Sequence, residues 1–182
     1  MTMDINAIMA ETLWHIDAEV EKGGWDQNAL LFAVIVGELG EGVGVIELAP
    51  APGWNVVLDI TEDPKDALRA LSLMTQVAPR ALIEQAYPPD QFYGLAFVTE
   101  AWMLRPALGE SLPPTVSFAG KVKDHPDRIE TRIIFCVSVD GKVAALSHER
   151  DGIPEAYTEE SGESLSGAIP DLLNEIIEGV RK

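Results

Sequence analysis

Residues 124–152, DHPDRIETRIIFCVSVDGKVAALSHERDG, decide the fold of this 182-residue chain. Asp140-Gly141 separates two runs of branched and apolar residues. Such a dipeptide is typical of a β-hairpin, because both central positions of its two-residue turn take positive φ, which aspartate and glycine tolerate. The stretch therefore predicts two long antiparallel strands joined by a tight turn.

A two-residue turn also fixes which side chains share a face, because side chains alternate along a strand. The expected core face carries the pairs Val139–Lys142, Val137–Ala144, Phe135–Leu146 and Ile133–His148, and the opposite face carries Ser138–Val143, Cys136–Ala145, Ile134–Ser147 and Arg132–Glu149. In this register Arg132 and Glu149 form an exposed ion pair worth about 0.2 to 1 kcal/mol. Cys136 and His148 fall on opposite faces, so we expect no cysteine–histidine catalytic site.

The chain before the hairpin begins with an amphipathic helix, predicted over residues 4–22. Its apolar residues recur at helical spacing and end at a glycine pair: Ile5, Ile8, Met9, Leu13, Ile16 and Val20, then Gly23-Gly24. Trp14 falls nearly opposite this stripe. Either another segment or subunit covers Trp14, or its indole lies flat on the surface.

The remaining elements complete the expected fold. Strands are predicted over residues 28–36, 43–49, 54–60 and 91–104, and helices over residues 64–77, 80–86 and 169–180. Asp63 before Pro64 is a favourable cap for the first of these helices, and Leu68, Leu71 and Met74 share one of its sides. The sequence thus predicts an α+β fold, with a largely antiparallel sheet of about six strands packed with three or four helices. Residues 1–182 are expected to form a single domain.

Composition limits the partners. Thirty acidic against 13 basic residues give a formal charge of −17, which repels phosphate backbones and anionic membrane surfaces. We expect no nucleic-acid binding and, without a long apolar run, no membrane insertion. Imitation of DNA would need regularly spaced acids, whereas those between Glu149 and Glu163 lie in a turn-rich segment. The acidic N-terminus lacks the features of a secretory signal, so a cytoplasmic location is expected.

Neither a cofactor nor a metal is expected. The glycines at positions 37, 40, 42 and 44 match no phosphate-binding motif and indicate a turn. His15 has Glu11 and Glu19 four residues to either side, but this spacing is common by chance and lacks the HExxH arrangement. The single cysteine, Cys136, rules out an intramolecular disulfide, and its mid-strand position is typical of a packed side chain.

One group of residues is a candidate ligand site. Glu100 lies in the middle of a predicted strand, and Arg132 lies in the first hairpin strand. His125 and Arg128 belong to HPDR, which leads into that strand. If these residues converge at one end of the sheet, they can hold an anionic small molecule. The structural alternative is that HPDR is only a turn and that Arg132 serves its cross-strand ion pair.

Two of these motifs also carry a resemblance. GWDQNALLFAV, residues 24–34, and HPDRIETRIIFCVSVDG, residues 125–141, resemble a family of uncharacterised, mostly actinobacterial proteins. The matching positions are Trp25, Asp26, Gln27, His125, Asp127 and Arg128. The resemblance implies no activity, substrate or cofactor. Physically, we expect Trp25 to seal the end of the first helix against the sheet, while Asp26 and Gln27 terminate backbone groups.

The sequence therefore favours a non-catalytic cytoplasmic protein that binds another protein or its own copy, in the latter case as a homodimer. The features behind this are the lack of a nucleophile with a base, of metal-ligand spacing and of a phosphate loop. Trp14 and exposed edge strands offer surfaces for a partner. The alternative is a small-molecule binder or an enzyme with a site formed by Glu100, His125, Arg128 and Arg132.

Overall fold

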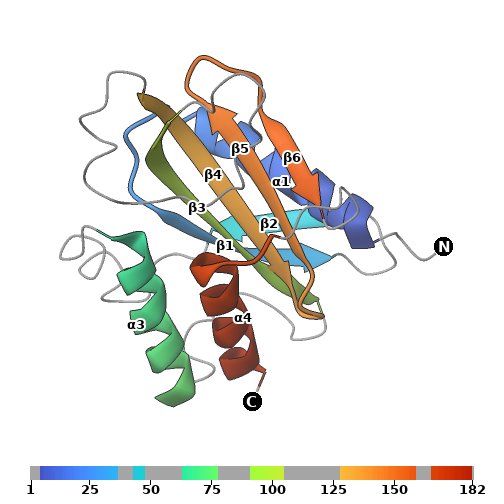
Figure 1. Cartoon of the computed structure of the whole chain (residues 1–182). Helices are drawn as coiled ribbons and strands as arrows, with labels where there is room; N and C mark the ends of the chain where they lie inside the picture. The colour runs from blue at the N-terminus through green and yellow to red at the C-terminus, as the bar shows by residue number, and fades with distance from the viewer. Residues whose placement is uncertain are drawn as a thin grey trace.

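The protein is an antiparallel sheet with helices on both faces (Figure 1). A computed structural model describes residues 5–36, 43–47, 63–77, 91–104, 128–158 and 165–181. In chain order they form α1 (Ile5–Glu21), β1 (Leu30–Val36), β2 (Val43–Glu47), α3 (Pro64–Val77), β3 (Phe92–Leu104), β4 (Arg128–Ser138), β5 (Val143–Glu149), β6 (Glu155–Thr158) and α4 (Ala168–Val180). Within these residues the sheet has six strands in the order β2-β1-β3-β4-β5-β6, every neighbouring pair antiparallel. The predicted α+β class is confirmed.

Several expectations fall on other parts of the chain. The predicted strand at residues 54–60, the predicted helix at 80–86 and the glycines at 37, 40 and 42 lie outside the described residues. So does His125 of the HPDR motif. Gly44 lies within β2, in agreement with the strand expected there.

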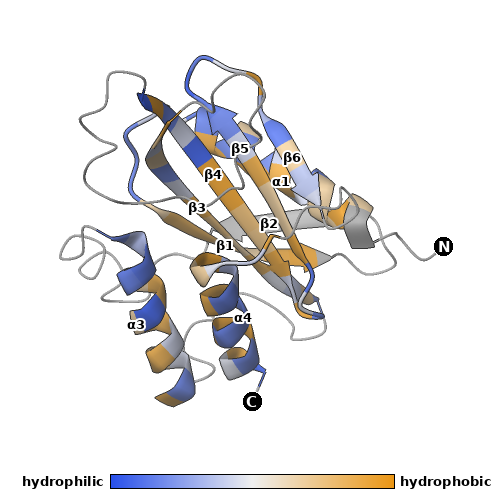
Figure 2. Cartoon of the chain, in the orientation of Figure 1, coloured by the Kyte–Doolittle hydropathy of each residue, from blue (hydrophilic) through white to orange (hydrophobic). Residues whose placement is uncertain are grey.

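The sheet is buried on both faces, as alternate residues of β4 demonstrate. Ile133, Phe135 and Val137 join the apolar core beneath α3 and α4. Ile134 and Cys136 join a second core beneath α1. Figure 2 shows the resulting run of hydrophobic residues through the middle of β3 and β4. This double burial requires that a polar side chain in the central strands find a partner inside the protein.

The β4–β5 hairpin exists, but its expected register is wrong by one residue. The observed pairs include Arg132–His148, Cys136–Ala144 and Val137–Val143. Ser138 N–H donates to the Lys142 carbonyl, and Gly141 N–H donates to the Ser138 carbonyl, both at 2.9 Å. The loop thus has three residues, and only its glycine, with φ of 78°, takes positive φ. This is a turn followed by a glycine bulge, which Asp-Gly also suits.

The helices match their predicted stripes closely. α1 buries Ile8, Met9, Leu13, Ile16 and Val20, and α4 buries Ile169, Leu172, Leu173, Ile176 and Ile177. α3 begins where predicted, and the Asp63 carboxylate accepts the Lys65 N–H at 2.9 Å. Of the three residues expected to share one side of α3, Leu68 and Leu71 are buried and Met74 is 44% exposed.

Candidate functional site

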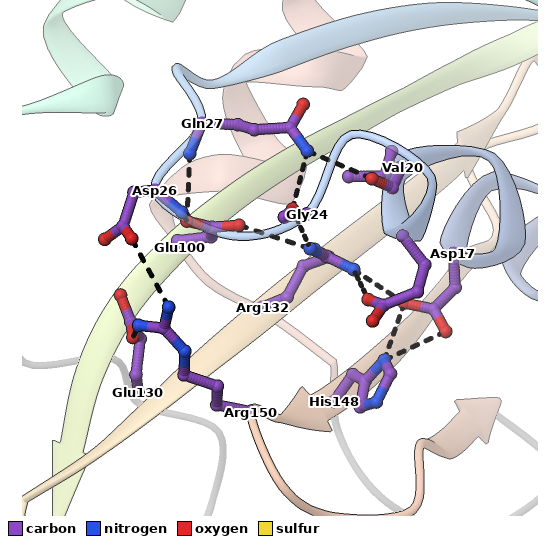
Figure 3. A network of polar contacts seen from close by, with 11 residues as sticks. Asp17, Val20, Gly24, Asp26, Gln27, Glu100, Glu130, Arg132, His148 and Arg150 are labelled. Atoms are coloured by element: carbon purple, nitrogen blue, oxygen red, sulfur yellow. Dashed lines mark hydrogen bonds and ion pairs between the residues drawn. The ribbon is translucent and has the colours of Figure 1, made fainter.

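A fully buried arginine is the chemical centre of the sheet face beneath α1. Arg132 Nη1 lies 2.7 Å from Oε2 of Glu21 and 3.6 Å from Oδ1 of Asp17. Its Nη2 donates to the Gly24 carbonyl at 2.7 Å and lies 3.4 Å from Oε1 of Glu100 (Figure 3). A buried charge is tolerated when it is paired and hydrogen-bonded, and these contacts provide both. We call these five residues the Arg132 cluster.

Glu100 holds the loop that follows α1. Its Oε2 accepts the backbone N–H of Asp26 at 2.7 Å and that of Gln27 at 3.2 Å. The Gln27 side chain donates to the carbonyls of Val20 at 3.0 Å and Gly24 at 2.6 Å. The loop needs these anchors because Gly24 and Asp26 both take positive φ, at 81° and 65°. The expectation that Asp26 and Gln27 terminate backbone groups here holds for Gln27. It is wrong for Asp26, whose carboxylate lies by Arg150 and whose own backbone N–H donates to Glu100.

Trp25, in the same loop, covers the cluster. The guanidinium carbon of Arg132 lies 4.5 Å from the centre of the Trp25 ring, and that of Arg150 lies 5.7 Å from it. His148 meets the indole edge-on, with ring centres 5.9 Å apart. Cation–π contacts of this kind are worth up to about 2 kcal/mol when water is excluded. Trp25 therefore seals the end of α1 against the sheet, as expected from the sequence.

His148 and Asp17 form a second part of this site. The His148 Nδ1 lies 3.0 Å from both carboxylate oxygens of Asp17. A carboxylate can only accept, so Nδ1 carries the hydrogen of this contact. Asp17 also lies beside Arg132, and one carboxylate thus orients both a ring and a guanidinium. The arrangement fixes the histidine in place.

A further ion pair extends the site toward the end of the sheet. Arg150 donates to Glu130 and lies 3.4 Å from Oδ2 of Asp26. The hydrogen bond to Glu130 raises the pKa of Arg150 above its ordinary value, and the charge of Asp26 adds to the shift. Five carboxylates face two guanidiniums in this region: Asp17, Glu21, Asp26, Glu100 and Glu130 against Arg132 and Arg150. This excess of negative charge opposes an anionic ligand at Arg132.

Cys136 lies on the same face as His148, because the hairpin register differs from the expected one. The prediction that they occupy opposite faces is wrong. They are nevertheless far apart: His148 pairs with Arg132, four residues along β4 from Cys136, or roughly 13 Å at the usual strand rise. Complete burial raises the pKa of the Cys136 thiol to about 12. The sulfur is therefore a packed side chain and no nucleophile.

The sequence-predicted site residues separate into three groups. Glu100 and Arg132 meet, but inside the protein, where each is used by its neighbours. The expected Arg132–Glu149 pair does not form, since Glu149 lies opposite Thr131. Arg128 stands apart, with its guanidinium carbon 4.4 Å from the centre of the Trp102 ring. His125 lies outside the described residues, so the structure brings two of the four together.

Other members of the site did not stand out in the sequence, although two carried a signal. Asp17 falls within the apolar stripe of α1, four residues after Leu13 and three before Val20, where a charge needs a buried partner. Trp25 belongs to the GWDQ motif. Glu21, Glu130 and Arg150 look like ordinary surface charges in the sequence and gave no signal.

Neither a metal site nor a membrane span can be built from the described chain. Over these ranges no three histidine, cysteine, aspartate or glutamate side chains are grouped so that they could hold a metal ion. Glu19, one of the acids beside His15, instead pairs with Lys22, and that hydrogen bond lowers the pKa of Glu19. No helix in the same part of the chain is long and apolar enough to cross a membrane.

Comparison with known proteins identifies a family. A family described as PPA1309-like protein has a model that matches residues 9–181, a range that includes every residue of the site. No curated protein and no solved structure matches the chain.

Proposed function

The chain belongs to the PPA1309-like protein family, and from that premise we propose that it works by binding another protein molecule and carries out no catalysis. The observation that carries the proposal is that the charged and thiol side chains of the site contact other parts of the protein and are not presented to a substrate. Arg132 is paired with Glu100 and Asp17, and Cys136 is buried with a raised pKa. These residues hold a loop and a helix to the sheet, which is a structural task.

The exposed surface supports the same proposal. Large apolar side chains lie in the open on α1, α3, β3 and the turn after β5: Trp14, Leu73, Met74, Val77, Leu104 and Ile153. Single exposed apolar residues are common, but Leu73, Met74 and Val77 lie together on α3, and such a group often marks a contact surface. The site under Trp25 gives the sheet a rigid frame from which such a surface can be presented.

Site-specific photo-crosslinking tests this proposal. A photoreactive amino acid is placed at Trp14, Leu73 or Ile153 in the full chain, and the cells that naturally make the protein are irradiated. We expect a discrete cross-linked protein adduct from at least one position. The binding proposal fails if all three positions give only the free chain. The claim that the protein carries out no catalysis fails if purified protein converts components of a metabolite extract and His148→Asn removes that conversion.

A second candidate function rests on Arg128. Arg128 is exposed, its guanidinium carbon lies 4.4 Å from the centre of the Trp102 ring, and no carboxylate of the described residues pairs with it. A guanidinium held in this way can donate two hydrogen bonds to a carboxylate or phosphate. Titration with citrate and with inorganic phosphate, followed by tryptophan fluorescence, tests it. A saturable change that Arg128→Ala abolishes supports a small anionic ligand, and no change in either titration removes it.

Two finer points belong to the same proposal. We propose that GWDQ and HPDR mark an actinobacterial family, and the support is that Trp25, Asp26 and Gln27 all serve the Glu100 and Arg132 contacts. A cytoplasmic location is proposed from the single cysteine, Cys136, which is buried and free. Cell fractionation with an antibody to the protein tests the location, and recovery outside the cytoplasm would contradict it.

A further inference from the structure

The outer ends of β3 and β4 carry an arginine and two apolar side chains on one face of the sheet. Trp102 pairs with Glu130, and Leu104 pairs with Arg128. Cross-strand partners point to the same side of a sheet, and so do residues two apart along a strand. These side chains therefore share the face that Arg132 occupies further in. Trp102 is partly buried, whereas Leu104 and Arg128 are exposed. We call Trp102, Leu104 and Arg128 the Arg128 site.

The guanidinium of Arg128 has donors that the described part of the chain leaves unused. Its carbon lies 4.4 Å from the centre of the Trp102 ring. A cation over a ring is held by the charge distribution of the ring, and its N–H groups keep their capacity to donate to oxygen. The other described arginines all donate to an oxygen: Arg69 to Asp66, Arg132 to Glu21 and Gly24, Arg150 to Glu130, and Arg181 to Val139. Arg128 is thus the one described arginine whose fork of donors is open to a ligand.

The neighbouring acids limit the charge that a ligand can carry. Glu130 pairs with Arg150, which also lies 3.4 Å from Oδ2 of Asp26 (Figure 3). These two acids and one base leave one negative charge in excess beside the site, and the whole chain has a formal charge of −17. Each further negative charge on a ligand is repelled by this background, whereas a single carboxylate offers two oxygens to the donors of Arg128 for only one charge. The site therefore favours a monocarboxylate over doubly charged phosphate or citrate.

The apolar neighbours define the rest of the ligand. Leu104 is 37% exposed and lies directly opposite Arg128 in the strand pairing. The accessible part of Trp102 lies two residues away on the same face. An apolar group placed on these two side chains removes apolar surface from water, and that burial adds to the affinity of the ion pair. A carboxylic acid with an aromatic or branched apolar group meets both requirements.

We infer that the Arg128 site binds a single carboxylate attached to an apolar group, with the carboxylate on Arg128 and the apolar group on Trp102 and Leu104. This inference rests on the second candidate function, the anion site at Arg128, and specifies its ligand. A free aromatic acid and the C-terminal residue of a peptide present the same chemistry, so the test includes both sources.

The test is two-dimensional NMR of the isotopically labelled full chain, in which the Trp102 indole N–H signal is identified by its loss in Trp102→Phe. Phenylacetate, acetate, phosphate, citrate and the neutral phenylacetamide are titrated separately at pH 7 and constant ionic strength. We expect phenylacetate to shift the Trp102 signal saturably. Acetate, phosphate and citrate should bind at the same place at least about 5-fold more weakly, because they lack the apolar contact. Phenylacetamide should give no saturable shift.

Two variants and a peptide complete the test. Arg128→Ala should weaken phenylacetate binding by at least about 10-fold. Arg69→Ala is the matched control, since Arg69 already pairs with Asp66 on α3, and it should bind phenylacetate like the wild type. A tripeptide that ends in phenylalanine is compared with its C-terminal amide, which should not bind. Tighter binding of the free tripeptide than of phenylacetate supports a peptide C-terminus as the source of the carboxylate, and weaker or equal binding supports a free acid.

Each other result overturns the inference in a different way. Phosphate or citrate that binds more tightly than phenylacetate, and loses its binding in Arg128→Ala, overturns the ligand assignment but leaves the anion site in place. A wild-type protein whose Trp102 signal responds to none of the anions overturns both. A phenylacetate shift that survives Arg128→Ala assigns the binding to apolar contact alone and overturns the role of the arginine. Circular dichroism of each variant establishes that it folds.

Discussion

Replacing Arg132 with leucine tests the structural role of the Arg132 cluster most directly. The change keeps much of the side-chain volume but leaves Asp17 and Glu100, whose side chains are 8% and 11% exposed, without their cation. Removing one partner of a buried ion pair costs about 3 to 5 kcal/mol. Stabilities of single domains are about 5 to 15 kcal/mol, so this is a large part of the total. The expected fall in melting temperature is about 6 to 20 °C for a chain of this size.

Urea unfolding at pH 7, followed by circular dichroism, measures the loss of unfolding free energy. Arg69→Leu is the control, because Arg69 and Asp66 form an exposed pair on α3 whose loss should cost less than about 1 kcal/mol. Adding Asp17→Asn and Glu100→Gln to Arg132→Leu should recover part of the loss.

The reasoning is refuted if Arg132→Leu and Arg69→Leu destabilise the protein equally. Arg132 would then contribute nothing to folding, and its burial among carboxylates would need a functional explanation. A triple variant that is no more stable than Arg132→Leu would refute the electrostatic part alone, because it would assign the cost to packing under Trp25.

Three further predictions concern packing and titration. Gly94→Ala should cost more than about 2 kcal/mol in urea unfolding, because its Cβ would lie 2.2 Å from the Val137 carbonyl oxygen, which belongs to the backbone of β4 and cannot turn away. Gly179→Ala should cost about 1 to 3 kcal/mol, because its Cβ would lie 2.6 Å from Oγ1 of Thr75, and Thr75→Ala should relieve part of that cost; equal losses in both backgrounds would contradict this. The Cys136 pKa rises from 9.0 to about 12 on folding, so the unfolded chain loses the proton first as pH rises above 9. Unfolding free energy should therefore fall with pH between 9 and 12, by up to about 1.4 kcal/mol per unit, and Cys136→Ala should remove that slope.

The fold could be predicted where one physical effect dominates. The helical stripes of α1 and α4 identify their buried sides, because only a 3.6-residue period explains residues such as Leu13, Ile16 and Val20. Asp63-Pro64 identifies the start of α3, because the aspartate is a favourable cap and the proline a favourable first helical residue. Met74 is exposed although Leu68 and Leu71 are buried, because Ser72 and Thr75 complete the buried side of α3 near its end. Hydrophobicity alone does not identify two polar residues as buried.

The site was less predictable, because it depends on contacts between residues far apart in the chain. Glu100 was conspicuous in the sequence as a charge in a buried strand, and Arg132 as a residue expected beside it. We expected an anionic ligand at Arg132, but carboxylates of the protein itself occupy that place. Those acids come from α1, 111 and 115 residues before Arg132, counted as 132 − 21 and 132 − 17. No local pattern encodes such a meeting. Within α1, only Asp17, a charge in an apolar stripe, indicated that a buried partner was needed.

The hairpin register depends on the same cluster. Asp140-Gly141 fits both a two-residue turn and the observed three-residue loop, so turn chemistry does not choose between them. β4 is held by its pairing with β3, in which Arg132 lies opposite Glu100, so a two-residue turn would shift β5 by one residue and turn its side chains over. That shift would carry His148 away from Asp17 and Leu146 out of the core beneath α1. The His148–Asp17 contact and the burial of Leu146 therefore favour the observed register, and the turn accommodates it.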